Sequence, residues 1–281
     1  MKTLKQILAL AVTLAVALSC GPKKEAPKVL VLYYSQTGNT KMVAEEIAGK
    51  LGADVEAIEA AVPYDGSYQE TISRCLEERQ AGTAPACQPV KADIQAYDVI
   101  FLGYPIWFGT YAPPVAAWLN EVDLSGKKVV PFCTFGSGGL DSSIRDLMAK
   151  QPEATVLPGY GVRAARLDAV PTEVDQFLKE NGFIEGEYVK LAEFPELQPV
   201  TEEETAIFQA AVKDYPMMGG VQPSTVASRT IPGGIEYVFV AVPQPREGGP
   251  APDPKMPPMR DMRVYVTALE GEAPVFTQVV R

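Results

Sequence analysis

The stretch "VLVLYYSQTGNTKMVAEEIAGKLG" (residues 29–52) decides the fold. It opens with the apolar run "VLVL" and closes with Val43, Ile47 and Leu51, which recur every four residues. The apolar run predicts a strand covered on both faces, and the fourfold spacing predicts a helix that ends at Gly52. A strand followed directly by a helix is the repeating unit of a parallel α/β sheet.

The same alternation continues to about residue 185. Further strands are expected at 54–60, 98–105, 127–135 and 154–163, and further helices at 112–122, 139–150 and 171–182. This order predicts a doubly wound five-stranded parallel sheet over residues 28–185. Such sheets bind ligands beyond the carboxyl ends of their strands.

The remaining chain has a different pattern, with a linker at 186–200 and a small α+β domain at 201–281. A helix is expected from Thr201, which begins a Thr-x-x-Glu motif and places Ile207, Ala211 and Tyr215 on one face. Four β-rich runs follow the helix, at 221–231, 234–242, 262–271 and 274–280. A loop rich in proline and glycine, 243–259, separates the second run from the third.

The N-terminus predicts export from the cytoplasm. Two lysines precede an apolar stretch at 7–18, which is typical of a signal peptide over residues 1–19. Cysteine after "ALS" resembles a bacterial lipobox, and this resemblance implies that Cys20 is lipidated. Residues 20–27 then form a flexible tether to a bacterial membrane, with the protein outside the cytoplasm. An ordinary secretory signal cleaved nearby is the alternative.

Composition excludes several classes of function. The formal charge of −10 over 281 residues argues against a nucleic-acid partner, and the complete lack of histidine removes His-ligated metals and Ser/His/Asp triads. No metal-ligand spacing is present among the four cysteines. Cys75 and Cys87 could pair outside the cytoplasm or stay free, whereas Cys133 lies in an apolar run and is expected to be buried. Residues 77–79, "EER", are expected on a solvated helix face.

The loop after the first strand, "SQTGNT" (35–40), has the composition of a phosphate cradle. Hydroxyl and amide side chains surround Gly38, which lets the main chain approach an anion closely. The N–H groups at the start of the next helix add partial positive charge. Neither a P-loop nor a G-x-G-x-x-G motif is present. The loop therefore suits a terminal monophosphate better than a triphosphate or a pyrophosphate.

Two further strand ends complete a family pattern. "PIWFG" (105–109) follows the strand at 98–105, and "TFGSGG" (134–139) follows the strand at 127–135. Together with "SQTGNT", these loops resemble those of the flavodoxins, and more closely the flavodoxin-like domains of bacterial secreted and lipid-anchored proteins. The resemblance implies FMN as cofactor. The residues it implies for FMN binding are Ser35, Gln36, Thr37, Gly38, Asn39, Thr40, Pro105, Ile106, Trp107, Phe108, Gly109, Thr134, Phe135, Gly136, Ser137, Gly138 and Gly139.

The resemblance also assigns roles within this set. The first loop would hold the FMN phosphate, Trp107 would stack on the flavin ring, and residues 134–139 would line its other edge. Phe135 is the nearest aromatic residue that could cover the outer face. FMN would supply the redox chemistry, at a low potential because the chain is acidic, and no catalytic side chain is expected.

Several functions remain open from the sequence. The protein could be an electron carrier with a redox partner protein, or an FMN-dependent oxidoreductase for a small acceptor such as a quinone. An NAD(P)H-dependent reductase and a flavin-free scaffold are the alternatives. The last 80 residues weakly resemble cystatins, which implies a binding or packing module. A protease inhibitor is the second interpretation there, since "VASRT" (226–230) stands where Q-x-V-x-G would be expected.

Overall fold

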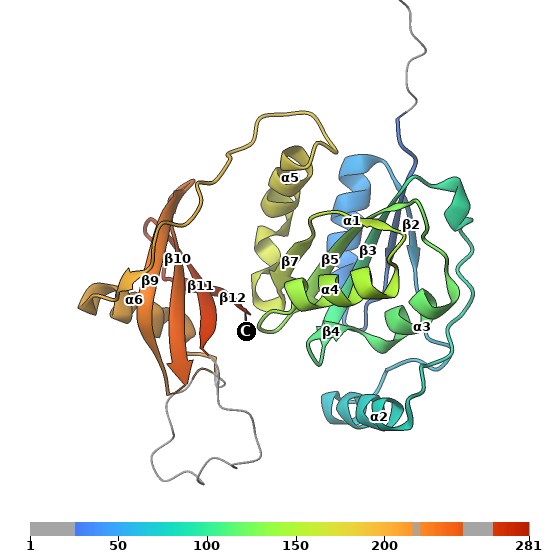
Figure 1. The fold of residues 1–281 in the computed structure, drawn as a ribbon, viewed down its shortest axis with the longest axis horizontal. Helices are drawn as coiled ribbons and strands as arrows, with labels where there is room; N and C mark the ends of the chain where they lie inside the picture. Colours follow the sequence, from blue (N-terminus) through green and yellow to red (C-terminus); the bar gives the residue numbers. More distant parts are fainter. Residues whose placement is uncertain (1–25, 216–217, 219, 244–260, 281) are drawn as a thin grey trace, which may run out of the picture.

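The computed structural model describes residues 26–215, 218, 220–243 and 261–280. The chain forms two β-sheets, each with its own helices, joined by residues 186–197 (Figure 1). The predicted signal peptide, the lipidation site Cys20 and nearly all of the Pro-rich loop lie outside the described residues. Within the described part of the chain, none of the helices combines the length and apolar character needed to cross a membrane.

The first sheet is parallel, with strand order β2-β1-β3-β5-β6. Its strands are β1 (Val29–Tyr33), β2 (Asp54–Ala57), β3 (Val99–Trp107), β5 (Lys128–Phe135), β6 (Thr155–Val156) and β7 (Tyr160–Arg163), with a short antiparallel β4 (Thr110–Tyr111) against β3. The predicted doubly wound sheet is confirmed. Its fifth strand is split into β6 and β7, which both pair with β5, and Pro158, which has no N–H for the ladder, lies in the gap.

Helices cover both faces of this sheet. One face carries α1 (Asn39–Leu51) and α5 (Val170–Glu180), and the other carries α3 (Pro113–Glu121) and α4 (Leu140–Lys150). Consecutive residues of β1 serve opposite cores, since Val31 belongs to the α1–α5 core while Leu30 and Leu32 belong to the α3–α4 core. Burial on both sides explains the continuous apolar run in the sequence. Two short 3₁₀ helices, η1 (Ile94–Ala96) and η2 (Ala164–Ala169), complete the domain.

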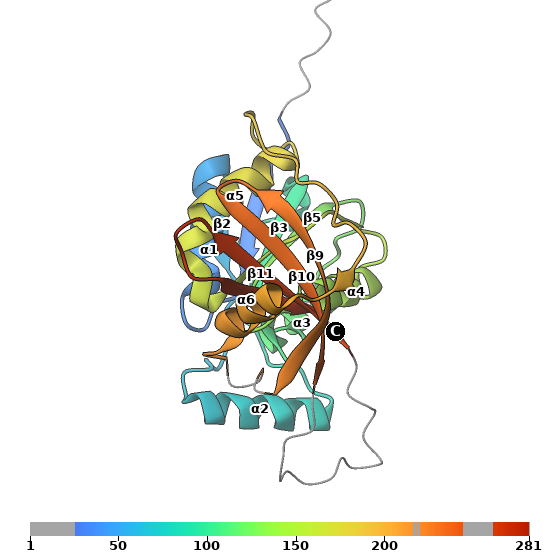
Figure 2. The same cartoon turned by 90° about the vertical axis from the view of Figure 1, so that its left-hand side faces the viewer.

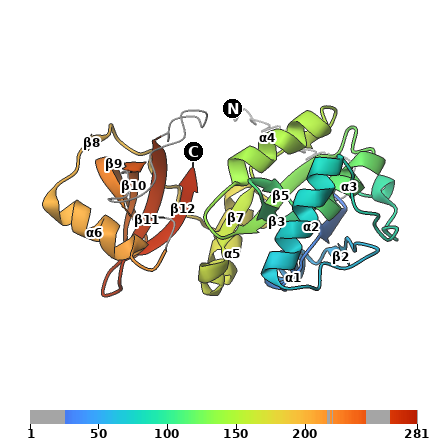
Figure 3. The same cartoon turned by 90° about the horizontal axis from the view of Figure 1, so that it is seen from below.

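Only the end of one helix, at residues 77–79, was expected from the sequence. α2 (Tyr68–Ala81) lies at the carboxyl end of the sheet (Figure 3). It is held by a capping box between Ser67 and Glu70, and Cys75 is one of only two buried residues in it. An apolar stripe is therefore missing, and periodicity could not reveal it.

The expectation for residues 77–79 holds for Glu77 and Arg79, which are exposed, but not for Glu78. Glu78 is partly buried and accepts hydrogen bonds from the Tyr64 hydroxyl at 2.6 Å and from Arg74 at 2.9 Å. Of the two alternatives left open for Cys75 and Cys87, the structure has both thiols free. Cys133 is fully buried, as expected.

The second sheet is antiparallel, with order β12-β11-β10-β9-β8. Its elements are β8 (Gln198–Pro199), α6 (Glu202–Val212), β9 (Val221–Ile231), β10 (Gly234–Pro243), β11 (Met262–Leu269) and β12 (Val275–Val280), and α6 packs across the sheet (Figure 2). The expected helix and four long strands are all present. The predicted face of α6, with Ile207, Ala211 and Tyr215, does pack against the core, where these residues are partly buried. The buried residues of α6 are their neighbours Phe208 and Val212.

Candidate functional site

A crevice of about 400 Å³ lies at the carboxyl ends of β1, β3 and β5. It brings together most of the predicted FMN residues: Ser35, Gln36, Thr37, Asn39, Thr40, Pro105, Ile106, Trp107, Phe108, Thr134, Phe135 and Gly136. The remaining five line two neighbouring cavities, Gly38 in one and Gly109, Ser137, Gly138 and Gly139 in the other. The three loops therefore meet at one place, as the strand order requires.

The first loop ends where α1 begins, and its geometry leaves donors available. Gly38 adopts a φ of 89° as the N-cap, and no side chain caps the helix. The Ser35 hydroxyl is buried and has no hydrogen-bond partner among the described residues. Buried polar groups are nearly always paired, so an orphan hydroxyl beside an uncapped helix start fits a site built for an added acceptor. A phosphate group has the acceptor oxygens that this loop lacks.

The base of the crevice is fixed by a contact between the first loop (35–40) and the third loop (134–139); the second loop is 105–109. Thr40 and Thr134 are both buried, and their hydroxyl oxygens lie 2.8 Å apart in a hydrogen bond. This contact joins residues 94 positions apart in the chain and sets the spacing between the two loops. Both hydroxyls therefore already have a hydrogen-bond partner before a ligand binds.

Gln36 has a different role from the one expected. Its side-chain amide donates one hydrogen bond to the Tyr64 carbonyl at 2.7 Å and another to the Thr71 hydroxyl at 2.9 Å. These contacts tie the first loop to α2 and to the segment before it. The Gln36 side chain therefore closes the crevice on this side, and only its backbone remains for an anion.

The Trp107 indole is held in place by neighbouring aromatic side chains. Its indole meets Tyr34 and Tyr64 edge-on, with ring centroids 5.8 and 5.3 Å apart. Arg74 in turn lies over the Tyr64 ring at 3.7 Å. Such edge-to-face packing holds the indole in one orientation, as a stacking platform in the crevice requires.

The expectation for Phe135 needs correction. Phe135 is only 4% exposed and belongs to the α3–α4 core, where it packs against the backbone of Gly161, so its ring is not free to cover an outer flavin face. Two other aromatic residues line the crevice and are accessible, Tyr68 at the start of α2 (82% exposed) and Phe108 (47% exposed). The sequence analysis did not identify Tyr68. The capping box of Ser67 and Glu70, which marks the start of α2 at Tyr68, is the sequence signal that could have found it.

The crevice lining is electrically neutral. None of the described residues that line it is Asp, Glu, Lys or Arg, and no group of three metal-ligating side chains occurs in the described part of the chain. Burial raises the pKa of the Cys75 thiol to about 11, with a smaller contribution from Glu78. Cys75 is therefore protonated near neutral pH and is no nucleophile. An anion in this crevice would be held by hydroxyls, amides and the start of α1.

The third loop contacts the C-terminal domain. The Val279 N–H of β12 donates to the Ser137 carbonyl at 2.6 Å. Arg163 donates to the Gly136 carbonyl at 2.9 Å and to the Phe276 carbonyl at 2.6 Å, with its guanidinium 4.3 Å from the Phe276 ring. The outer edge of β12 is thus covered by the loop that forms one wall of the crevice.

Fold and site together define a class: a doubly wound α/β protein with a neutral, hydroxyl-lined crevice at the point where strand order reverses. A family model described as Flavodoxin matches residues 28–176, which is more than half of the chain. The chain belongs to the flavodoxin family. The cofactor of this family is FMN, so the expected cofactor is confirmed at the level of the family.

Individual relatives cover the same part of the chain. An NAD(P)H dehydrogenase (quinone) from Gluconacetobacter diazotrophicus is 33% identical over 99 residues, which are 34% of this chain and 46% of that protein. The match thus spans less than half of the relative. A solved structure from Bacteroides eggerthii is 31% identical and covers 53% of this chain and 96% of its own, with a TM-score of 0.46. A flavoprotein from Lactobacillus acidophilus, solved in complex with FMN, is 24% identical with a TM-score of 0.45 and covers 48% of this chain and 93% of its own.

Proposed function

We propose that this protein binds FMN in the 400 Å³ crevice and acts in electron transfer or in the reduction of a small acceptor such as a quinone. The observation that carries the proposal is the buried Ser35 hydroxyl without a partner, beside the uncapped start of α1. Membership of the flavodoxin family supports the same cofactor. The relative named as a quinone dehydrogenase supports the choice of acceptor.

The chain's own residues would bind and orient the cofactor. The Ser35 and Thr37 hydroxyls and the Asn39 amide donate to the phosphate, with the first N–H groups of α1. Trp107, fixed by two tyrosines, supports one side of the flavin ring. When bound, FMN supplies reversible redox chemistry. The lining carries no charged side chain, and the protonated Cys75 thiol takes no part.

We also propose an extracytoplasmic address with a lipid anchor at Cys20. The support is the N-terminal sequence alone, since residues 1–25 lie outside the described part of the chain. Metabolic labelling of the expressed protein with a radioactive fatty acid tests this proposal. Incorporation that disappears in Cys20→Ala is the expected result, and labelling that persists in the variant contradicts it.

A titration of FMN fluorescence with the purified chain lacking residues 1–19 tests the cofactor. We expect quenching of the flavin emission on binding. The double variant Thr37→Val/Asn39→Ala leaves phosphate oxygens unpaired and should weaken binding by about 1–3 kcal/mol per lost charged hydrogen bond. Riboflavin, which lacks the phosphate, is the matched control, because its affinity should not change in the variant. A wild-type chain that binds neither flavin refutes the proposal.

The same preparation distinguishes the possible redox roles. Steady oxidation of NADH or NADPH in the presence of menadione indicates a reductase. An FMN-loaded protein that accepts electrons from dithionite but turns over neither nucleotide indicates a carrier that needs a separate donor.

A further inference from the structure

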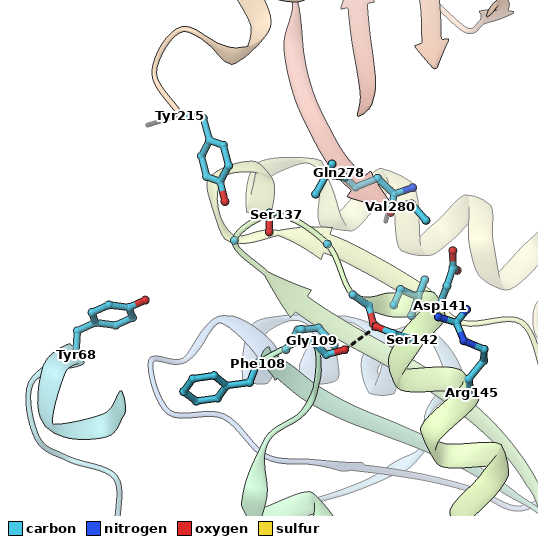
Figure 4. A pocket seen from close by; sticks show the side chains of 16 residues that line it. Tyr68, Phe108, Gly109, Ser137, Asp141, Ser142, Arg145, Tyr215, Gln278 and Val280 are labelled. Carbon is cyan, nitrogen blue, oxygen red and sulfur yellow. Dashed lines mark hydrogen bonds between the residues drawn. The ribbon is translucent and has the colours of Figure 1, made fainter. Parts of the chain in front are cut away.

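A second cavity, of about 580 Å³, lies between the two domains. Its near wall is formed by the second and third loops and the first turns of α4. Its far wall comes from Tyr215 after α6 and from the end of β12, including Gln278 and Val280 (Figure 4). We propose that this interdomain cavity binds the electron acceptor, an uncharged planar aromatic compound with carbonyl oxygens. The inference rests on the proposed FMN site, and it makes the C-terminal domain half of the acceptor site.

The interdomain cavity adjoins the cofactor crevice. Tyr68, Ile106, Phe108 and Gly136 line both spaces. The two spaces therefore have a common wall, and a molecule in the interdomain cavity would lie next to the proposed cofactor site. Electron transfer needs such proximity, and no other cavity described here shares both the second and the third loop with the crevice.

Phe108 stands at the boundary in a strained conformation. Its φ of 53° is the only positive value among the described non-glycine residues, and a bulky side chain is strained in this region. The neighbouring Gly109 is fixed, since its carbonyl accepts a hydrogen bond from the Ser142 hydroxyl at 2.5 Å. Strain held in place by the surroundings is a common property of binding sites.

The chemistry of the walls selects the class of ligand. Three aromatic side chains line the interdomain cavity, which favours a flat apolar ring: Tyr68, Phe108 and Tyr215. Side chains with N–H or O–H groups lie on both walls and suit carbonyl oxygens, including Gln278 from β12. Asp141 and Arg145 bring one charge of each sign, so the lining favours a neutral molecule. The volume falls in the range of about 300–1,000 Å³ typical of small-molecule sites.

The two walls are fixed relative to each other by short-range contacts. Val279 pairs with Ser137 through the backbone, and Arg163 donates to carbonyls on both sides of the interface. Gly138 packs so closely on β12 that an added Cβ would overlap the Val279 carbonyl. Close backbone contact of this kind preorganises the space between the domains.

The test uses the full mature chain and menadione, with binding followed by calorimetry in the absence and in the presence of FMN. Val280→Trp fills the far wall and should weaken menadione binding at least tenfold, while the FMN affinity changes less than twofold. The matched control is Val275→Trp at the other end of β12, where the side chain is 38% exposed and lines none of the described cavities. It should leave both affinities unchanged.

Gln278→Leu is the second variant, since it removes the amide and nearly keeps the size. A three- to tenfold loss of menadione affinity with unchanged circular dichroism is expected. Menadione binding that is equal in wild type, Val280→Trp and Gln278→Leu overturns the inference, as does a wild-type chain that does not bind menadione. Failure of FMN binding with intact, variant-sensitive menadione binding would instead refute the cofactor assignment alone.

Discussion

The two ends of the cofactor crevice are built in different ways. At the first loop, closure comes from within the same domain, where Gln36 bonds to Thr71 of α2 and to the segment before it. At the third loop, closure comes from another domain, where β12 pairs with Ser137 and Arg163 bonds to both sides. The end at the first loop keeps the unpaired Ser35 hydroxyl. At the third loop, the carbonyls of Gly136 and Ser137 already accept hydrogen bonds.

This difference separates binding of the phosphate from binding of the ring. The phosphate end depends only on residues of the flavodoxin-like domain, so it should work whether or not the C-terminal domain is docked. The ring end shares its backbone with the domain interface. Changes that break the contacts between the third loop and β12 should therefore alter the ring site and leave the phosphate site intact, which the following variants can test.

Gly138→Ala should have the largest effect. The added Cβ would overlap the Val279 carbonyl, so β12 must move away from the third loop. We expect a loss of about 2–3 kcal/mol in the free energy of unfolding, and faster proteolysis in the 186–197 segment. Gly136→Ala is the matched control, because a Cβ there meets nothing within 4 Å. Equal melting temperatures for the two variants would refute the close docking.

Arg163→Met should have the next largest effect. The variant keeps the length of the side chain but leaves the carbonyls of Gly136 and Phe276 without their donor, at about 1–2 kcal/mol of stability. Thermal unfolding measures the loss. Riboflavin affinity should fall together with FMN affinity, because only the ring end loosens. A variant that loses FMN affinity but keeps riboflavin affinity would show that the ends are not separate.

Much of the architecture could be predicted from local patterns. The apolar strands and the 3.6-residue periodicity of α1 and α5 carry the α/β fold, and the Thr201 capping box marks the start of α6. The extent of α2 was missed, with helix expected only at residues 77–79, because α2 buries only Thr71 and Cys75. Its stability therefore depends on tertiary bonds that no local pattern encodes.

The site was predictable to the same extent. The three loops could be placed together because parallel strands end at one edge, and twelve of their residues do line the crevice. The orientation of individual side chains was not predictable. Gln36 bonds to α2 and Phe135 turns into the core, since both depend on partners distant in the chain. The docking of β12 on the third loop left no signal in either segment.

The free energy of unfolding measured as a function of pH tests the packing of α2, which closes the crevice at the first loop. The pKa of the Cys75 thiol is raised from 9.0 to about 11 in the folded chain, mainly by burial. The folded state therefore holds this proton more tightly, and the contribution to stability is complete below pH 9 and lost as the pH rises toward about 11. In Cys75→Ala, the free energy of unfolding should fall less over this interval than in wild type, by about 2 kcal/mol. Parallel curves for the two proteins would contradict the assignment.

The smallest expected effect on stability is at Phe108. Asparagine tolerates a positive φ better than phenylalanine or leucine does, so Phe108→Asn should be more stable than Phe108→Leu by about 0.5–1 kcal/mol in urea unfolding. Both variants lose the aromatic ring at the boundary of the crevice and should bind FMN and riboflavin more weakly by the same factor. Ser35→Ala should weaken FMN alone, because its hydroxyl lies at the phosphate end. If Phe108→Asn also discriminated between the two flavins, the phosphate would have to reach the second loop, and the division of the crevice into two ends would be wrong.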